Sequence, residues 1–271
     1  MLPLLWEVVM SQPNQNLQPF VDRLSSHSQL SDEESRALLE MPSRASQARP
    51  NQDIVRLGEK TDYACFIVDG LAGRFGQNRN GARQITALHI PGDMADLHSV
   101  VLPNATSALQ ALTTTTVLTI PHQALREVAA RFPAVAEAFW RECMIDAAIL
   151  SQWVVNVGRR DSKTRIAHLL CEMALRYGAK TESRGSYAFP ATQTHLADMT
   201  ALTNVHVNRT LGALRDAGLA QMHLQQVEIL DWKQLQAVAE FDPDYLGTKG
   251  AALEPLRLLD RAGPLHPPSV H

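Results

Sequence analysis

Cysteine is scarce in this sequence, and no apolar run is long enough to cross a bilayer free of charges. The 271 residues include three cysteines, Cys65, Cys143 and Cys171. An odd number of widely spaced cysteines forms neither a disulfide framework nor a Cys-x-x-Cys motif, so a reducing cytoplasm is the expected compartment. The lack of a spanning run predicts no membrane contact.

An excess of basic residues is also missing. Lys and Arg number 25 against 28 Asp and Glu, which gives a formal net charge of -3. Any contact with nucleic acid must therefore come from the local placement of a few cations. The sequence has no glycine-rich phosphate loop, no His/Asp/Glu cluster at metal-ligand spacing and no nucleophile in a catalytic motif. We therefore predict no catalytic residue, no metal site and no enzymatic activity.

Residues 1–22 are expected to form an N-terminal extension. The apolar opening carries Glu7 and lacks a basic lead, which argues against a secretory signal, and Met10 is a candidate for the true start. A Gln/Asn/Pro-rich stretch follows it. Ser31 is then the predicted N-cap of a short helix, with Glu34 at the capping-box position.

Residues 23–131 are predicted to form an all-β barrel or roll. Short apolar or alternating runs are separated by turn signals such as Asp69-Gly70 and Pro91-Gly92-Asp93. The threonines at 113–116 are expected to belong to a strand, because threonine fits a half-buried pleat. Strands are expected at 54–57, 65–68, 71–75, 84–90, 108–112 and 116–120.

A long helix is predicted over residues 132–158, with Pro133 in its first turn and Gly158 at its end. In its C-terminal half Asp146 is the one side chain expected to carry charge, and apolar residues cover every face. A helix that is apolar all round must be covered all round. One interpretation is a dimerisation helix that packs on the roll and on a second copy of the chain; the alternative is an ordinary buried core helix.

Residues 159–240 contain the pattern most informative about function. Two helices are predicted around a tight turn at 200–202, where Ala201 stands in place of the more common glycine. Thr192 is the predicted N-cap of the first helix. The second opens at Thr203 and places Val207, Leu211 and Leu214 on one apolar stripe.

The opposite face of the second helix carries short or polar side chains, as a helix that enters the major groove requires. Asparagine pairs with adenine, arginine with guanine, and valine contacts the thymine methyl group. Helix N-termini attract phosphates. On spacing alone, the alternative is an αα-hairpin with a solvated polar face. We predict base contacts from Asn204, Val205, Asn208 and Arg209, and phosphate contacts from Thr192 and His206.

A hairpin is predicted directly after these helices. Runs at 219–223 and 227–230 flank Gln225-Gln226, and Asp231-Trp232 starts a closing helix. Two helices followed by a hairpin make a winged helix, which favours DNA binding over the αα-hairpin. Residues 241–271 contain five prolines and are expected to form a loosely ordered tail.

Over residues 24–240 the chain resembles the Crp/Fnr family of bacterial transcription regulators. The resemblance implies an α+β protein with an N-terminal β-roll of the cyclic-nucleotide-binding type (a double-stranded β-helix or jelly roll), a long dimerisation helix and a C-terminal winged helix-turn-helix. In that family the positions matching Asn204, Val205 and Arg209 contact bases, and those matching Thr192 and His206 contact phosphates. The resemblance is carried by residues 67–73, 89–93, 155–160 and 205–211.

The resemblance is weaker at the effector site. Members that bind cyclic nucleotides carry a Gly-Glu-Leu run and an Arg-Ser or Arg-Thr pair, whereas the matching stretches here are Ala95-Asp96-Leu97 and Thr106-Ser107-Ala108. A buried phosphate without a cation is costly, so cyclic AMP is not expected. The N-terminal cysteine group that holds an iron-sulfur cluster in other members is missing. The degenerate pocket comprises Asp96, Leu97, Thr106 and Ser107.

Haem-sensing members of the family use histidine ligands, and His89 and His98 lie in the predicted roll. A histidine there is expected to be hydrogen-bonded or exposed instead. We therefore predict no cofactor. The resulting hypothesis is a cytoplasmic homodimer that binds palindromic double-stranded DNA under an unidentified effector or none, with RNA polymerase as a further partner if it activates. The alternative is a small-molecule sensor that acts through protein partners.

Overall fold

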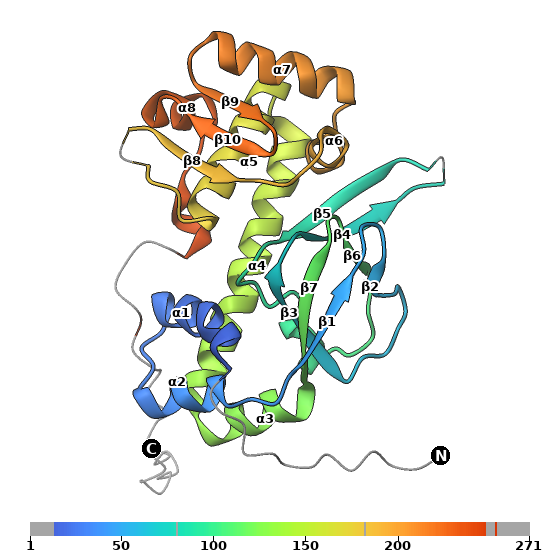
Figure 1. Cartoon of the computed structure of the whole chain (residues 1–271), viewed down its shortest axis with the longest axis vertical. Coiled ribbons are helices and arrows are strands. Elements are labelled where there is room, and N and C mark those ends of the chain that lie inside the picture. Colours follow the sequence, from blue (N-terminus) through green and yellow to red (C-terminus); the bar gives the residue numbers. More distant parts are fainter. Residues whose placement is uncertain (1–13, 80, 182, 248–252, 254–271) are drawn as a thin grey trace, which may run out of the picture.

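The computed structural model describes residues 14–79, 81–181, 183–247 and 253. In Figure 1 the long helix α4 (Pro133–Arg159) forms the axis of the molecule. A β-roll lies along one side of α4, short helices pack at one end, and the winged-helix domain occupies the other end. None of the described helices is long and apolar enough to cross a membrane.

The N-terminal part folds into helices that the sequence analysis recovered only in part. The predicted helix at Ser31 is α2 (Asp32–Leu39), and its capping box is present, with Ser31 N donating to Glu34 Oε2 at 2.7 Å. Before it lie the 3-10 helix η1 (Gln15–Leu17) and α1 (Gln18–His27). Part of the predicted extension is therefore helical core, because Phe20 and Leu24 are fully buried. Residues 1–13, with Met10, lie outside the described residues.

The β-roll confirms the predicted fold of the N-terminal domain. One antiparallel sheet has the order β1-β7-β3 and the other β2-β6-β4-β5. Phe66 and Leu118 line the face toward the helices, and Ile67 and Leu109 lie in the core between the sheets. The elements are β1 (Arg44–Ala48), β2 (Asp53–Val55), β3 (Tyr63–Asp69), β4 (Ala72–Gln77), β5 (Arg83–His89), η2 (Leu97–Val100), β6 (Ala108–Ala111) and β7 (Thr115–Pro121).

The threonine run is only partly a strand, contrary to the sequence expectation. β6 ends at Ala111 and β7 begins at Thr115. Between them, Thr113 Oγ1 accepts a hydrogen bond from Leu71 N at 2.8 Å. The first threonines of the run therefore serve the neighbouring turn between β3 and β4 rather than extending a ladder.

The helix α3 (His122–Arg131) leads into α4. One side of α4 is buried against the roll and α5 by Phe139, Ile149 and Trp153. The other side is open: Trp140 is 65% exposed and Met144 is 67% exposed. The predicted long helix is confirmed, and its apolar coverage by this one chain is incomplete.

The C-terminal domain is a winged helix. Its elements are α5 (Ser162–Arg176), β8 (Gly185–Ala188), α6 (Gln193–Thr200), α7 (Asn204–Asp216), β9 (Ala220–His223), β10 (Gln226–Ile229) and α8 (Trp232–Val238), and the sheet order is β8-β10-β9. The hairpin turn lies one residue earlier than predicted, because Leu224 and Gln225 both adopt positive φ, 45° and 64°. Two such residues in succession match the right-handed twist of a tight hairpin.

The start of the expected loose tail is folded. Phe241 is 5% exposed, and the 3-10 helix η3 (Pro243–Leu246) follows it with Leu246 6% exposed. η3 packs against α4. The rest of the predicted tail lies outside the described residues, apart from Leu253.

Candidate DNA-binding surface

The helix-turn-helix is built by two N-caps and one left-handed residue. Thr192 Oγ1 accepts from His195 N at 3.1 Å and opens α6. Thr203 Oγ1 accepts from His206 N at 3.3 Å and opens α7. Between the helices, Ala201 has φ 53° and ψ 41°, the conformation that ends a helix sharply. The turn predicted at this position is confirmed, with alanine in a conformation that favours glycine.

The second helix divides into a buried and an exposed face. Val207 and Leu214 are fully buried, and Leu211 packs against the same core while remaining partly exposed. On the other face Val205 is 76% exposed. The four predicted base-contacting residues, Asn204, Val205, Asn208 and Arg209, are all exposed and lie together on this face.

The exposed side chains of α7 differ in whether they already form hydrogen bonds or ion pairs within the protein. Asn204 Nδ2 donates to Thr194 Oγ1 at 3.4 Å, a long contact that ties α7 to the start of α6. Arg209 makes no hydrogen bond or ion pair with any residue that the structure describes. Its guanidinium is therefore available to a ligand in the orientation in which α7 presents it.

The two predicted phosphate-contacting residues, Thr192 and His206, stand exposed at the N-terminal ends of α6 and α7. His206 Nδ1 lies 3.0 Å from Thr203 Oγ1. Within the described helices α6 and α7, neither first turn contains an acidic side chain. The partial positive charge of both N-termini is thus left for an external anion.

The hairpin of β4 and β5 lies against the helix-turn-helix, which the sequence did not reveal (Figure 1). Gln84 Nε2 donates to Met199 O at 3.1 Å, and Arg83 Nε lies 3.7 Å from Asp198 Oδ2. Thr203 and His206 line the crevice of about 920 Å³ between the hairpin and α7. No local sequence motif predicts such a contact, because it joins two segments that are far apart in the sequence.

The wing adds little positive charge. The two strands contribute His223 and Glu228, and the turn residue Leu224 is 86% exposed. On α7, Arg215 is held by Asp216 at 2.9 Å. The geometry therefore favours recognition by a few well-placed groups over general attraction to phosphate.

The predicted degenerate effector pocket is occupied by an arginine from another strand. Arg74 of β4 forms an ion pair with Asp96, and its Nη1 donates to Ser107 O at 2.9 Å and to Ser107 Oγ at 3.2 Å. Leu97 is buried beside them, whereas Thr106 points to solvent. Sequence reasoning missed Arg74 because it lies on β4, outside the stretches 95–97 and 106–108 that were compared with the effector site. The guanidinium is already paired with a carboxylate of this chain.

A cavity of about 240 Å³ separates β5 from α4, and Arg74, His89, His98 and Asp146 are among its lining residues. Burial lowers the pKa of His89 to about 3. Its Nε2 is buried and has no hydrogen-bond partner among the residues that the structure describes. Burial, with Glu142 nearby, raises the pKa of Asp146 to about 7. The cavity therefore holds a neutral imidazole and a carboxyl that titrates near neutrality.

The cysteines lie on separate elements. Cys65 of β3 and Cys171 of α5 are fully buried, and Cys143 of α4 is partly buried. Burial raises the pKa of Cys65 to about 12 and that of Cys143 to about 11, so both thiols stay protonated. Among the described residues no three His, Cys, Asp or Glu side chains gather as metal ligands would.

Comparison with known proteins agrees with this two-part organisation. Residues 46–132 match the cyclic nucleotide-binding domain family, and residues 164–238 match the Crp-like helix-turn-helix domain family. Among relatives, the transcriptional activator protein Anr of Pseudomonas protegens is 24% identical, with 76% of this chain and 85% of that protein covered. The transcriptional activator protein FnrL of Cereibacter sphaeroides is 27% identical, with 79% and 87% covered.

Solved structures show the same fold. FixK2 from Bradyrhizobium japonicum superposes with a TM-score of 0.63 at 22% identity, covering 73% of this chain and 98% of that one. A CooA mutant from Carboxydothermus hydrogenoformans gives a TM-score of 0.60 at 16% identity, covering 85% and 98%. A roll, a long helix and a winged helix with an exposed recognition face define a DNA-binding transcription regulator. The chain has a cyclic nucleotide-binding domain and a Crp-like helix-turn-helix domain, and its relatives are transcriptional activators of the Anr and Fnr type.

The prediction of no cofactor is wrong in the light of these relatives. The Anr and Fnr regulators that the chain matches bind an iron-sulfur cluster as their sensor. The prediction rested on three missing features: the N-terminal cysteine group for a cluster, an arginine for a cyclic nucleotide, and a clear histidine ligand for haem. The three thiols of this chain lie on β3, α4 and α5 and do not gather, so the described residues do not fit a cluster.

Proposed function

We propose that this regulator places α7 in the major groove of double-stranded DNA. The observation that carries the proposal is the exposed face of α7, where Arg209 is unengaged beside Asn204, Val205 and Asn208. Arginine and asparagine read purine edges, and an exposed valine contacts a methyl group. Thr192 and His206, at the two open helix N-termini, bind backbone phosphates and fix the register of the helix.

We further propose that α4 is the dimerisation helix. Its open side carries Trp140, Met144, Ala147, Ser151, Val154 and Gly158, all exposed and spaced four and three residues apart in turn. This is the heptad spacing of a coiled-coil seam, and its three small members allow two helices to approach closely. A two-fold axis along α4 pairs two α7 helices for a palindromic site whose half-sites lie about 34 Å apart.

In this scheme residues 23–131 form the sensor domain, 132–158 the dimerisation helix and 159–240 the DNA-binding domain. The relatives named as transcriptional activators favour activation through RNA polymerase. A regulator of this kind acts in the cytoplasm, where its DNA lies, and carries out no chemistry. The roll would then control the position of the winged-helix domain relative to α4.

Selection from a random pool of DNA tests the proposal. We expect the wild-type protein to enrich a palindrome, and Arg209→Ala to weaken binding to it by about 1 to 3 kcal/mol while relaxing one base position in each half-site. Arg215→Ala is the matched control, since Arg215 lies on the same helix but is paired with Asp216. If no sequence is enriched, the result favours the alternative in which the winged helix docks a protein partner.

A further inference from the structure

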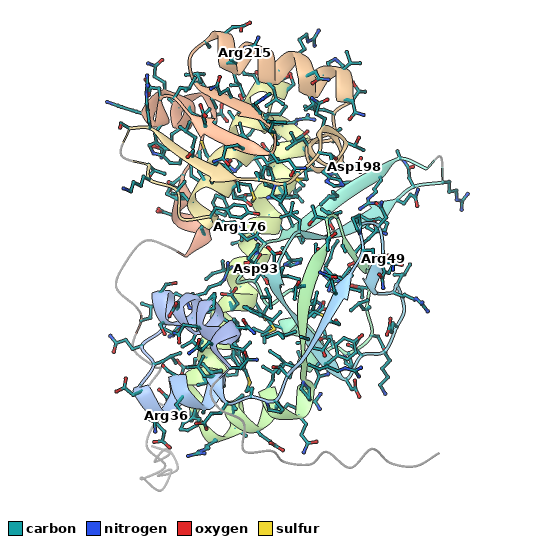
Figure 2. The ribbon with its side chains drawn as sticks, in the orientation of Figure 1. Arg36, Arg49, Asp93, Arg176, Asp198 and Arg215 are labelled. Atoms are coloured by element: carbon teal, nitrogen blue, oxygen red, sulfur yellow. The ribbon has the colours of Figure 1, made fainter. Side chains whose placement is uncertain are left out.

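A continuous series of buried and partly buried charged and polar side chains crosses the joint between the roll and the winged helix. Asp93, in the turn after β5, lies at its centre. Arg23 of α1 donates to Asp93 Oδ1 at 2.8 Å, and Arg176 of α5 donates to Asp93 Oδ2 at 2.6 Å. Figure 2 shows Asp93 and Arg176 side by side where the two domains meet. One carboxylate thus joins cations from the N-terminal helix and the DNA-binding domain.

The series continues from Arg176 into the segment that follows the winged helix. Arg176 Nη1 lies 3.3 Å from Glu172 Oε1. Glu172, itself fully buried, also accepts from Trp153 Nε1 of α4 at 3.0 Å and from Tyr245 Oη of η3 at 2.9 Å. Because His168 Nε2 lies 3.1 Å from the same Tyr245 hydroxyl, η3 is held by two groups of α5.

On the other side of Asp93 the series reaches α4 a second time. Arg23 also pairs with Glu142, and Glu142 Oε2 lies 3.1 Å from His27 Nε2 at the end of α1. The complete order is Tyr245, Glu172, Arg176, Asp93, Arg23, Glu142 and His27. We call these seven residues the interdomain ion chain.

The ion chain is charged at its centre. Burial alone would raise the pKa of Asp93, but the guanidinium groups of Arg176 and Arg23 hold it below its ordinary value. Burial alone would lower the pKa of Arg176, and Asp93 with Glu172 raises it instead. Charge-assisted hydrogen bonds of this kind have strict geometry, and breaking one partner leaves a buried charge uncompensated.

The covalent link between the domains is short, and the dihedral angles of its residues leave the domains some freedom to rotate. α4 ends at Arg159 and α5 begins at Ser162, so two residues join them. The first of them, Arg160, has an extended conformation (φ -84°, ψ 151°) and so ends the helix. Side-chain contacts across the joint can therefore fix the angle between α4 and the winged helix. The ion chain supplies directional contacts at that place, from the roll, α1, α4 and η3 together.

We propose that Asp93, Arg176 and Glu172 are positioning residues for DNA recognition, which hold α7 at one distance and angle from α4 and so set the half-site spacing that the dimer accepts. Tyr245 extends this role to the segment after the winged helix. The inference rests on the proposed homodimer on palindromic DNA. One added base pair rotates a half-site by about 35° and moves it by about 3.4 Å, so a rigid joint rejects altered spacings.

The first test measures affinity for the selected palindrome and for versions with one base pair added to or removed from its centre. We expect the wild-type protein to prefer the selected spacing by about tenfold or more, comparable to the cost of a mismatched base pair. Tyr245→Phe, which removes only the hydroxyl, and Asp93→Asn should reduce this preference to about threefold or less. Glu33→Gln, which breaks the exposed pair of Glu33 with Arg131, is the control and should leave the preference unchanged.

The second test needs no DNA. Spin labels on Gln47→Cys in the roll and Leu224→Cys at the wing, in protein with Cys143→Ser and diluted with unlabelled chains, report the distance between the domains. Tyr245→Phe should broaden the distance distribution while the melting temperature changes little. If both variants keep the wild-type distribution and spacing preference, the ion chain does not position α7 and the inference is wrong. If the wild-type protein selects no DNA, the proposed function fails, and the distance measurement still decides whether the ion chain holds the joint.

Discussion

The interdomain ion chain and the exposed face of α7 use the same kinds of side chain in opposite ways. At the joint Arg176 is 6% exposed and contacts Asp93, Glu172 and the Leu88 carbonyl. On α7 Arg209 is exposed and contacts no other described residue through a hydrogen bond or an ion pair. A buried cation with its partners in place fixes geometry, whereas an exposed one without partners can respond to a ligand. The contrast separates residues whose substitution lowers the stability of the fold from residues whose substitution lowers the affinity for DNA.

The largest expected effect comes from removing a buried cation. Arg176→Met leaves Asp93 and Glu172 without a shared partner, and we expect the free energy of unfolding to fall by about 3 to 5 kcal/mol. Urea denaturation followed by circular dichroism measures the change. Arg131→Met, which breaks an exposed pair, should cost less than about 1 kcal/mol. Equal losses of unfolding free energy in the two variants would show that the buried cation contributes no more to stability than the exposed one.

The next effect concerns a carboxyl beside the ion chain. The pKa of Asp146 is raised from 3.8 to about 7 by burial and by Glu142, with Asp93 adding to the shift and Arg23 and Arg176 opposing it. Because the folded pKa lies above the unfolded value, the folded state binds the proton more tightly, and stability from this group is present below about pH 4 and lost as the pH rises through 7.

Allowing for solvent screening, the loss in the free energy of unfolding is about 2 kcal/mol between pH 4 and pH 8. Asp146→Asn keeps the volume and removes the titration, so its stability should change less over this range and exceed that of the wild type at pH 8. Urea midpoints of both proteins across the range measure the difference. Parallel curves for the two would show that Asp146 titrates at an ordinary pKa.

On the exposed side, Arg209→Ala should leave the urea midpoint unchanged and reduce affinity for the selected site by about 1 to 3 kcal/mol. The loss arises because a base-edge contact is removed without disturbing any contact within the protein. Fluorescence anisotropy at a stated salt concentration measures it. A variant that unfolds more easily would place Arg209 among the structural cations instead.

The smallest effect is expected at His206, which is proposed to contact a phosphate. His206→Ala should weaken binding to every sequence alike, by less than about 1 kcal/mol, and leave base preference intact. Selection repeated with the variant protein shows the preference directly. A changed consensus would mean that His206 reads a base.

Much of the winged helix could be predicted from sequence because its signals are local. Thr192 and Thr203 cap helices within three residues, and the apolar stripe of Val207 and Leu214 follows one helical period. The hairpin turn was misplaced by one residue, because leucine rarely adopts the positive φ found at Leu224. The sequence analysis missed α1 because its few buried apolar residues are separated by polar ones, so no clear apolar stripe is visible in the sequence.

Contacts between distant segments account for what the sequence could not show. Arg74 reaches Asp96 across the roll, and Arg176 reaches Asp93 between domains. No spacing rule links such pairs, since each depends on how whole elements pack. The cofactor prediction failed for a different reason: it took the missing ligand residues of this chain as decisive against each known sensor group of the family, whereas the relatives it matches are regulators that bind an iron-sulfur cluster.

The exposed Val205 has a consequence for chemical marks on DNA. In the proposed complex with DNA, this side chain would contact the methyl group at the 5 position of a pyrimidine and would make no hydrogen bond to the ring. Uracil at that position lacks the methyl group and should therefore weaken binding, although it pairs with adenine as thymine does. A 5-methylcytosine placed there presents the same methyl group. At this contact α7 would therefore bind the methylated base as it binds thymine.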